Sequence, residues 1–257
     1  FSSIFNYYMG TELERLYYDD RKQKINLIFS IIINLAVLVF FKYYGFLLNT
    51  IGGIIGIHIP HPELSLPIGL SFYTFRNLSY LFDIYLSKVS AQRNFLTFAV
   101  YSTMFPYTSA GPIVRYTDIE TQLKQRTINI SRFGIGAELF VKGLAKKVLL
   151  ADNLSVLYSS ICGHPQMSVF TSWLGILAYT MQLYFDFSGY SDMAIGLGKM
   201  LGFDFNKNFD YPYISTSVSE FWRRWHISLG SWFRDYIYIP LGGNRVSTLK
   251  HIRNILV

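Results

Sequence analysis

Long uncharged runs of apolar residues alternate with short charged clusters along this chain. The clearest runs cover residues 25–41, 43–62, 94–114 and 169–185. A further run, residues 66–85, contains one arginine and one aspartate. Because about 20 apolar residues in a helix are enough to cross the hydrocarbon core of a bilayer, this pattern predicts several transmembrane helices.

Interruptions inside these runs predict bent or partial spans. Two adjacent glycines and Pro60 break the run 43–62, which predicts a segment that re-enters the membrane. Pro106 predicts a kinked or unwound end for the run 94–114. Residues 133–150 are apolar but carry four charged side chains, so they could cross obliquely or lie in the interface. The sequence thus predicts an all-α, polytopic membrane protein with transmembrane, re-entrant and interfacial amphipathic helices.

Composition supports this prediction and excludes one class of partner. Of the 257 residues, 51% are apolar and 15% are charged, whereas soluble domains average about 25% charged residues. We expect a single membrane-embedded domain over residues 1–257. The net charge is +7, and the basic residues cluster between apolar runs, as the positive-inside rule expects of cytoplasmic loops. This distribution argues against nucleic acid as a partner.

The richest candidate for chemistry is the stretch from Ser217 to Tyr238. Ser217, followed three residues later by Glu220, is a capping box that predicts the start of a helix. Aromatic residues then recur at steps of three and four, which predicts one amphipathic helix with His226 on its aromatic face. Four neighbours on or beside this face are candidate lining residues: Trp222, Arg223, Trp225 and Arg234. Asp235, on the opposite side of the helix, is a further candidate.

His226 has two interpretations. It could be a histidine held by a backbone carbonyl in a packed aromatic layer. Alternatively, desolvation could keep its imidazole neutral as a general base, which takes the proton of an acceptor hydroxyl as that hydroxyl attacks a thioester or ester. Ionisable groups within membranes are costly and therefore candidates for function. The residues alone leave both interpretations open.

A second polar patch follows the run 169–185 and includes Asp186, Ser188 and Tyr190. It predicts a helix break whose polar groups satisfy freed backbone donors, or a wall that holds a cavity open and positions substrate. Asp186 and Asp192 are six residues apart and would not share a helix face. We therefore predict no metal site here.

Two long motifs resemble one family. The segment QLYFDFSGYSDMAIGLGKMLGF, residues 182–203, and the segment SEFWRRWHISLGSWFRDYIYIPLGGNR, residues 219–245, are similar to the membrane-bound O-acyltransferases, and most of all to their bacterial alginate O-acetylation branch. Shorter segments at residues 66–72, 110–115 and 142–147 also match. The resemblance covers the chain from about residue 26 onwards.

The resemblance implies helices arranged around a central tunnel in the bacterial inner (cytoplasmic) membrane. It implies transfer of an acyl group, in the first place acetyl, to a hydroxyl of an exported polysaccharide or to a periplasmic acetyl-relay protein. The donor would be acetyl-CoA or another acyl thioester, with no bound cofactor. His226 matches the first of two functionally important family histidines and is the catalytic candidate of this chain, although the family's catalytic base is usually assigned to the second. The lining candidates are Asp186, Ser188, Tyr190, Trp222, Arg223, Trp225, Arg234 and Asp235.

The ends of the chain and the competing functions add further expectations. The chain starts at Phe1 and stops within an apolar run, which predicts a piece cut at both ends. The second family histidine, in a tryptophan-histidine-glycine segment, would lie beyond it. His226 could then line the tunnel rather than abstract a proton, and the piece alone would be an inactive fragment. A non-catalytic transporter or flippase is the other alternative, which the lack of internal repeats disfavours.

Overall fold

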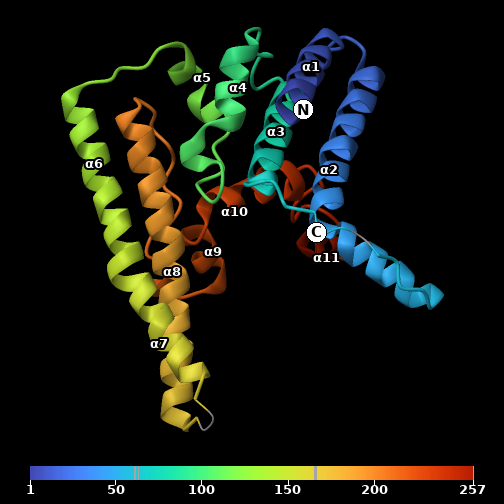
Figure 1. Ribbon diagram of the computed structural model, residues 1–257. Coiled ribbons are helices and arrows are strands. Elements are labelled where there is room, and N and C mark those ends of the chain that lie inside the picture. Colours follow the sequence, from blue (N-terminus) through green and yellow to red (C-terminus); the bar gives the residue numbers. More distant parts are fainter. Residues whose placement is uncertain (61, 63, 165–166, 257) are drawn as a thin grey trace. The chain divides into compact units, whose positions relative to one another are not determined.

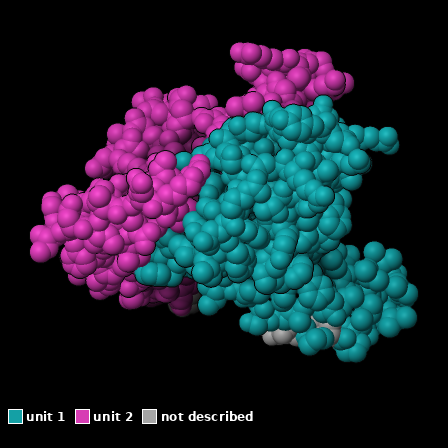
Figure 2. Space-filling model, turned by 90° about the horizontal axis from the view of Figure 1, so that it is seen from above, with its two compact units in different colours: residues 1–109, 115–117 teal, residues 110–114, 118–257 magenta. Residues whose placement is uncertain are grey.

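Helices form every regular element that a computed structural model gives for residues 1–60, 62, 64–164 and 167–256 (Figure 1). The chain divides into two compact units (Figure 2). Unit 1 contains residues 1–109 and 115–117, and unit 2 contains residues 110–114 and 118–257. The all-helical prediction is confirmed for the described residues, while the single-domain prediction stays a prediction.

The described residues of unit 1 form four helices and one 3₁₀ turn. Its elements are α1 (Ser2–Arg15), α2 (Asp20–Ile55), α3 (Leu70–Tyr85), α4 (Phe95–Thr103) and the turn Phe105–Tyr107. The kinked end predicted near Pro106 is confirmed, because α4 stops at Thr103 and Pro106 lies within the 3₁₀ turn. The proline ring cannot continue an α-helix in its interior.

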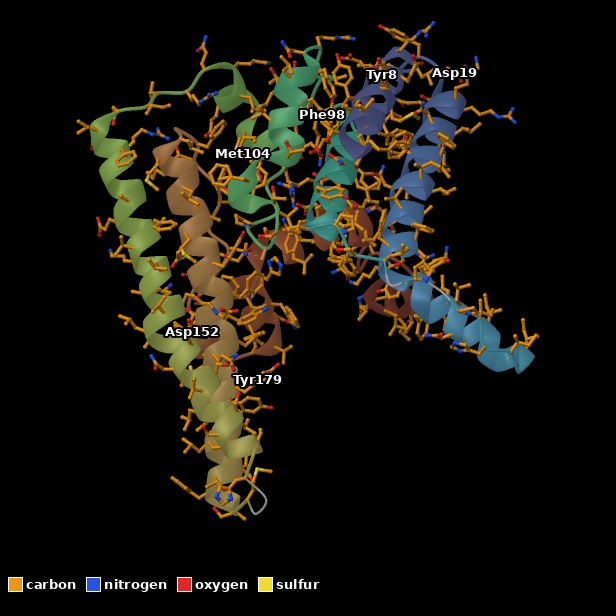
Figure 3. All side chains as sticks on the ribbon, in the orientation of Figure 1. Tyr8, Asp19, Phe98, Met104, Asp152 and Tyr179 are labelled. Atoms are coloured by element: carbon orange, nitrogen blue, oxygen red, sulfur yellow. The ribbon has the colours of Figure 1, made fainter. Side chains whose placement is uncertain are left out.

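Helix α2 is the one described helix that is long and apolar enough to cross a membrane. The carboxylate of Asp19 caps its start by accepting a hydrogen bond from the backbone N–H of Lys22 (Figure 3). Its 36 residues correspond to about 54 Å of helix. The sequence predicted separate segments on either side of Lys42, and this is wrong. A lone lysine leaves the backbone hydrogen bonds intact, so the helix continues through it to Ile55.

Buried amides join the helices of unit 1. The side chains of Asn6 in α1 and Asn34 in α2 exchange two hydrogen bonds, of 2.9 and 2.8 Å. Asn77 of α3 donates to the Ser2 hydroxyl and accepts from the Ser102 hydroxyl of α4. These paired polar groups fix which helix faces meet, because an unpaired buried amide is costly.

Unit 2 is organised around a long antiparallel helical hairpin (Figure 1). The first arm is α6 (Ile130–Ala145), a π-helical segment (Lys146–Ala151) and α7 (Asp152–Cys162); the second arm is α8 (Val169–Met200). The shorter elements are α5 (Tyr116–Lys124), a 3₁₀ turn (Pro212–Ile214), α9 (Val218–Arg224), α10 (Ile227–Phe233), a π-helical turn (Arg234–Tyr238) and α11 (Thr248–Leu256).

Glycines let α6 and α8 pack backbone against backbone. A Cβ placed on Gly143 would lie 2.5 Å from the Gly189 carbonyl oxygen, and one on Gly136 would lie 2.6 Å from the Gly196 carbonyl oxygen. Further along the hairpin, α7 has no buried residue, and its Tyr158 packs on Tyr179 of α8 with 4.9 Å between ring centroids (Figure 3). The exposed apolar side chains at this end are suited to contact lipid.

Candidate functional site

Two helices of seven residues each flank His226. Helix α9 begins as predicted, since the Ser217 hydroxyl accepts a hydrogen bond of 3.1 Å from the Glu220 N–H. The Glu220 carboxylate, however, accepts from the backbone N–H of Thr216 rather than from that of Ser217. The helix ends at Trp225, and His226 has φ 42° and ψ 56°. The prediction of one continuous helix up to Tyr238 is therefore wrong.

A residue far upstream explains the break. The backbone carbonyl of Asn208 accepts a hydrogen bond of 2.9 Å from the Ile227 N–H, and its side-chain oxygen accepts one of 3.2 Å from the Ser228 N–H. The first N–H groups of a helix have no partner within the helix. Asn208 supplies partners for two such groups of α10, and so allows a new helix to start directly after His226.

His226 is buried beside aromatic rings, and two polar groups approach its Nδ1 atom, the Asn208 side-chain oxygen and, at 3.5 Å, the Ser228 hydroxyl. The residue is 8% exposed. The Nδ1 atom is 3.1 Å from the Asn208 side-chain oxygen. The Phe187 ring of α8 meets the imidazole edge-on, with 4.8 Å between ring centroids. His226 lies outside α2, and burial lowers the pKa of its imidazole to about 4. The ring is therefore neutral at pH 7.

Asn208 is the centre of a buried polar cluster. Its side-chain oxygen also accepts from the Ser228 hydroxyl at 2.9 Å, and its amide nitrogen donates to the Ser191 hydroxyl of α8 at 3.1 Å. The Ser228 hydroxyl in turn accepts from the Ile113 N–H at 3.0 Å. Sequence reasoning missed Asn208, Ser191 and Ser228. The available signal was an asparagine between Phe205 and Phe209, in a stretch where both aromatic rings are buried.

Trp225 belongs to the aromatic wall beside His226, whereas Trp222 does not. Trp225 packs against Phe209 of the loop and Phe221 of α9, at centroid distances of 5.1 and 5.7 Å. It also approaches Tyr184 of α8 at 6.3 Å. Trp222 is 58% exposed and meets only Phe221 in the ring contacts of the described residues. The structure thus brings one of the two predicted tryptophans to the site.

The polar patch of α8 does not break the helix, which corrects the prediction for Asp186, Ser188 and Tyr190. Helix α8 continues from Val169 to Met200 through all three. The carboxylate of Asp186 pairs with Lys147 at 2.7 Å, and Asp192 pairs with Lys146 at 2.6 Å. The π-helical segment of the other arm thus neutralises both acids, and the backbone stays helical.

The remaining predicted residues have different surroundings. Ser188 is buried, and its hydroxyl has no hydrogen-bond partner among the residues that the structure describes. Tyr190 is partly buried, and Arg223 is exposed. Arg234 pairs with Asp235 at 2.7 Å at the start of the π-helical turn. Over the described ranges of the chain, no group of three or more His, Cys, Asp or Glu side chains is placed to hold a metal ion.

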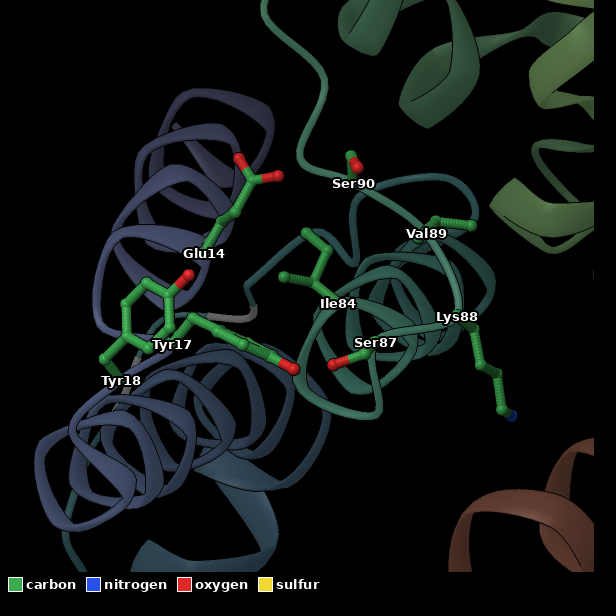
Figure 4. Close-up of a pocket in the computed structure, with 8 residues that line it drawn as sticks. All are labelled: Glu14, Tyr17, Tyr18, Ile84, Ser87, Lys88, Val89 and Ser90. Carbon is green, nitrogen blue, oxygen red and sulfur yellow. The ribbon is translucent and has the colours of Figure 1, made fainter.

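Unit 1 contains a separate pocket of about 410 Å³ between the ends of α1 and α3 (Figure 4). Its charged groups already have partners, since Glu14 pairs with Arg93 and Lys88 pairs with Asp83. The lining residues are Glu14, Tyr17, Tyr18, Ile84, Ser87, Lys88, Val89 and Ser90. The charged groups that line this pocket are therefore used in ion pairs.

Comparison with known proteins decides the family. The family model described as "MBOAT, membrane-bound O-acyltransferase family" matches residues 68–257. The chain belongs to this family. The resemblance drawn from the two long motifs is thereby confirmed, and so is the alginate O-acetylation branch.

Three relatives illustrate the range of proteins to which the chain is similar. "Probable alginate O-acetylase AlgI" of Pseudomonas aeruginosa is 44% identical over 99% of the chain and 50% of its own length. "Peptidoglycan O-acetyltransferase" of Helicobacter pylori is 34% identical over 100% of the chain and 54% of its own length. "Teichoic acid D-alanyltransferase" of Bacillus subtilis is 28% identical over 71% and 47%. The chain spans about half the length of the curated relatives it matches.

Proposed function

We propose that the chain is part of a multi-pass O-acyltransferase of the bacterial inner membrane, which transfers an acetyl group to a hydroxyl of an exported polysaccharide. Family membership supports the reaction class. The relatives named as O-acetylating enzymes act, by their names, on alginate or peptidoglycan, which supports a carbohydrate acceptor. A periplasmic acetyl-relay protein would present the same acceptor chemistry, a hydroxyl.

The buried imidazole of His226, set against the Phe187 ring and hydrogen-bonded to Asn208, is the observation that carries this proposal. The acceptor oxygen attacks the carbonyl carbon of an acyl thioester, such as acetyl-CoA. The new C–O bond forms and the C–S bond breaks. The hydroxyl proton passes to the imidazole and then to the departing sulfur, which leaves as a thiol. A ring that is neutral at pH 7 can accept this proton, whereas a protonated ring cannot.

The test is His226→Gln in the complete gene product, expressed in cells that export the polymer. We expect the initial rate at which ester groups are added to the polymer to fall by about 10²- to 10⁴-fold, which is the usual contribution of a general base. His164→Gln is the matched control, because His164 is exposed in a loop, and it should leave acylation unchanged. Full acylation by His226→Gln at normal protein level would refute the proposal. Loss of polymer export with an unchanged ester content would instead favour a transporter.

A further inference from the structure

The two ring nitrogens of His226 have different surroundings. Nδ1 faces the side-chain oxygen of Asn208, while Nε2 has no hydrogen-bond partner among the described residues. The orientation of the Asn208 amide follows from a neighbour whose chemistry is unambiguous. The Ser228 backbone N–H points at the same side-chain atom of Asn208, at 3.2 Å. Because a backbone N–H only donates, that atom must be the acceptor oxygen rather than the amide nitrogen.

The amide oxygen then determines the tautomer of the histidine. Oδ1 of Asn208 has no proton to give, so a hydrogen bond to Nδ1 requires that Nδ1 carries the proton. In a neutral imidazole the lone pair then lies on Nε2. The structure therefore identifies Nε2 as the nitrogen that is able to accept a proton.

The rest of the cluster fits this arrangement. The Ser228 hydroxyl oxygen lies 3.5 Å from Nδ1, but its shorter contact, 2.9 Å, is with Asn208 Oδ1. The Ser228 hydroxyl receives the Ile113 N–H, so its own proton is free to go to Asn208 Oδ1. The amide nitrogen of Asn208 donates to Ser191. Asn208 and Ser191 are each 1% exposed and Ser228 is 9% exposed, so bulk water does not compete strongly for these bonds. Three donors thus converge on Oδ1, and the direction of the Ser228 backbone N–H is fixed.

No charge takes part in this cluster. Most charged groups on the elements packed around it form ion pairs with one another: Asp192 with Lys146, Asp186 with Lys147, Lys199 with Asp204, Asp210 with Lys207 and Arg224, Glu220 with Arg224, and Arg234 with Asp235. Arg223 of α9 is exposed to solvent. An asparagine orients the imidazole without a carboxylate, which would favour the protonated ring. The ring is held in place and stays neutral.

We propose that Asn208 is the positioning residue of this acyltransferase: its amide oxygen holds His226 in the Nδ1-protonated form and presents Nε2 to the acceptor hydroxyl. The tautomer itself follows from the hydrogen bonds. Its use by an acceptor hydroxyl rests on the proposed function, so the two parts are tested by separate measurements.

Nitrogen NMR of the complete gene product, labelled with ¹⁵N-histidine in detergent, tests the tautomer without any acylation assay. The His226 signal, assigned by its absence from His226→Gln, should show the pattern of an Nδ1-protonated neutral ring. Asn208→Ala should change that pattern, whereas Asn208→Asp should keep it, because a carboxylate also accepts from Nδ1. Asn153→Ala, at an exposed position of α7, is the matched control and should change nothing. An Nε2-protonated ring in the natural protein, or an unchanged pattern in Asn208→Ala, would overturn the proposal.

The pH dependence of acylation tests the use of the tautomer. Asn208→Ala should lower the rate by about 10-fold or more, as part of the contribution of a general base. In Asn208→Asp the added carboxylate raises the pKa of His226, so the acid limb of the pH–rate profile should move to higher pH. A residue that only supports the fold would not move this limb. If Asn208→Asp has a normal unfolding midpoint and the acid limb of its pH–rate profile does not move, the positioning role is overturned. If the NMR pattern changes as expected but the natural protein shows no acylation, only the proposed function is contradicted.

Discussion

Replacing Gly143 by alanine tests whether α6 and α8 depend on direct backbone contact. The new methyl group would lie 2.5 Å from the Gly189 carbonyl oxygen and 2.7 Å from the Met193 amide nitrogen. Both neighbours are backbone atoms, which cannot rotate away. Gly134 lies on the same helix, but a Cβ there would meet nothing within 4 Å. The pair Gly143→Ala and Gly134→Ala therefore differs in packing and not in helix propensity.

The contacts set the size of the effect. Restoring an ordinary separation of about 3.4 Å requires the helices to part locally by about 0.9 Å, a kind of overpacking that costs about 1–3 kcal/mol. Alanine also favours a helix over glycine by about 0.5–1 kcal/mol. Gly134→Ala should thus stabilise by about 0.5–1 kcal/mol. Gly143→Ala should be less stable than Gly134→Ala by the full overpacking cost of about 1–3 kcal/mol.

Thermal unfolding of the two variants in the same detergent measures this difference. For a chain of this size it corresponds to a gap of about 2–12 °C between their midpoints. The double variant Gly136→Ala/Gly143→Ala should cost less than the sum of its single changes, because one separation of the helices relieves both contacts. Equal midpoints for Gly143→Ala and Gly134→Ala would refute close packing of α6 on α8.

Two further predictions concern buried polar groups. Asn6→Ala leaves the Asn34 amide without its partner in α1. It should therefore lower the free energy of unfolding, measured by denaturant titration, by about 1–3 kcal/mol. Replacing both Asn6 and Asn34 by leucine should cost less, and a larger loss in that double variant would contradict this reasoning. The pKa of His226 in the folded protein, about 4, lies below the value of about 6.5 in an unfolded chain. Protonation of the ring therefore favours unfolding. The free energy of unfolding should fall as the pH drops from 6.5 towards 4, by at most about 1.4 kcal/mol per pH unit. His226→Gln should flatten unfolding curves measured over this range, and an identical pH dependence in that variant would contradict the neutral ring.

A local signal in the sequence correctly predicted the start of α9. Ser217 caps α9 through its hydroxyl, and the helix begins there because the capping contact involves residues only three apart. The unwound segment at Pro106 has an equally local cause. The choice of His226 as the central candidate came from its aromatic neighbours and from the family resemblance. Its burial, with an aromatic ring on one side, fits that choice.

Contacts between distant residues account for the errors. The break at His226 depends on hydrogen bonds that the Ile227 and Ser228 N–H groups donate to Asn208, which lies 18 positions before His226 in the sequence. No helical period can reveal these bonds. Aromatic residues recur on both sides of the break, so the pattern favoured a continuous helix. The reverse error occurred at Asp186, where a polar run predicted a break. Lys147 of the other arm pairs with that carboxylate, and this partner lies 39 positions away in the sequence.

The backbone at His226 has a consequence for how this protein can change. A φ of 42° lies in the left-handed region, where a residue other than glycine costs about 1–2 kcal/mol. Glycine would relieve this cost, but it would also delete a side chain that is 8% exposed and packs on Phe187. The cavity left behind costs more than the strain. Random variants screened only for heat resistance should therefore keep histidine at position 226, even where activity is not selected.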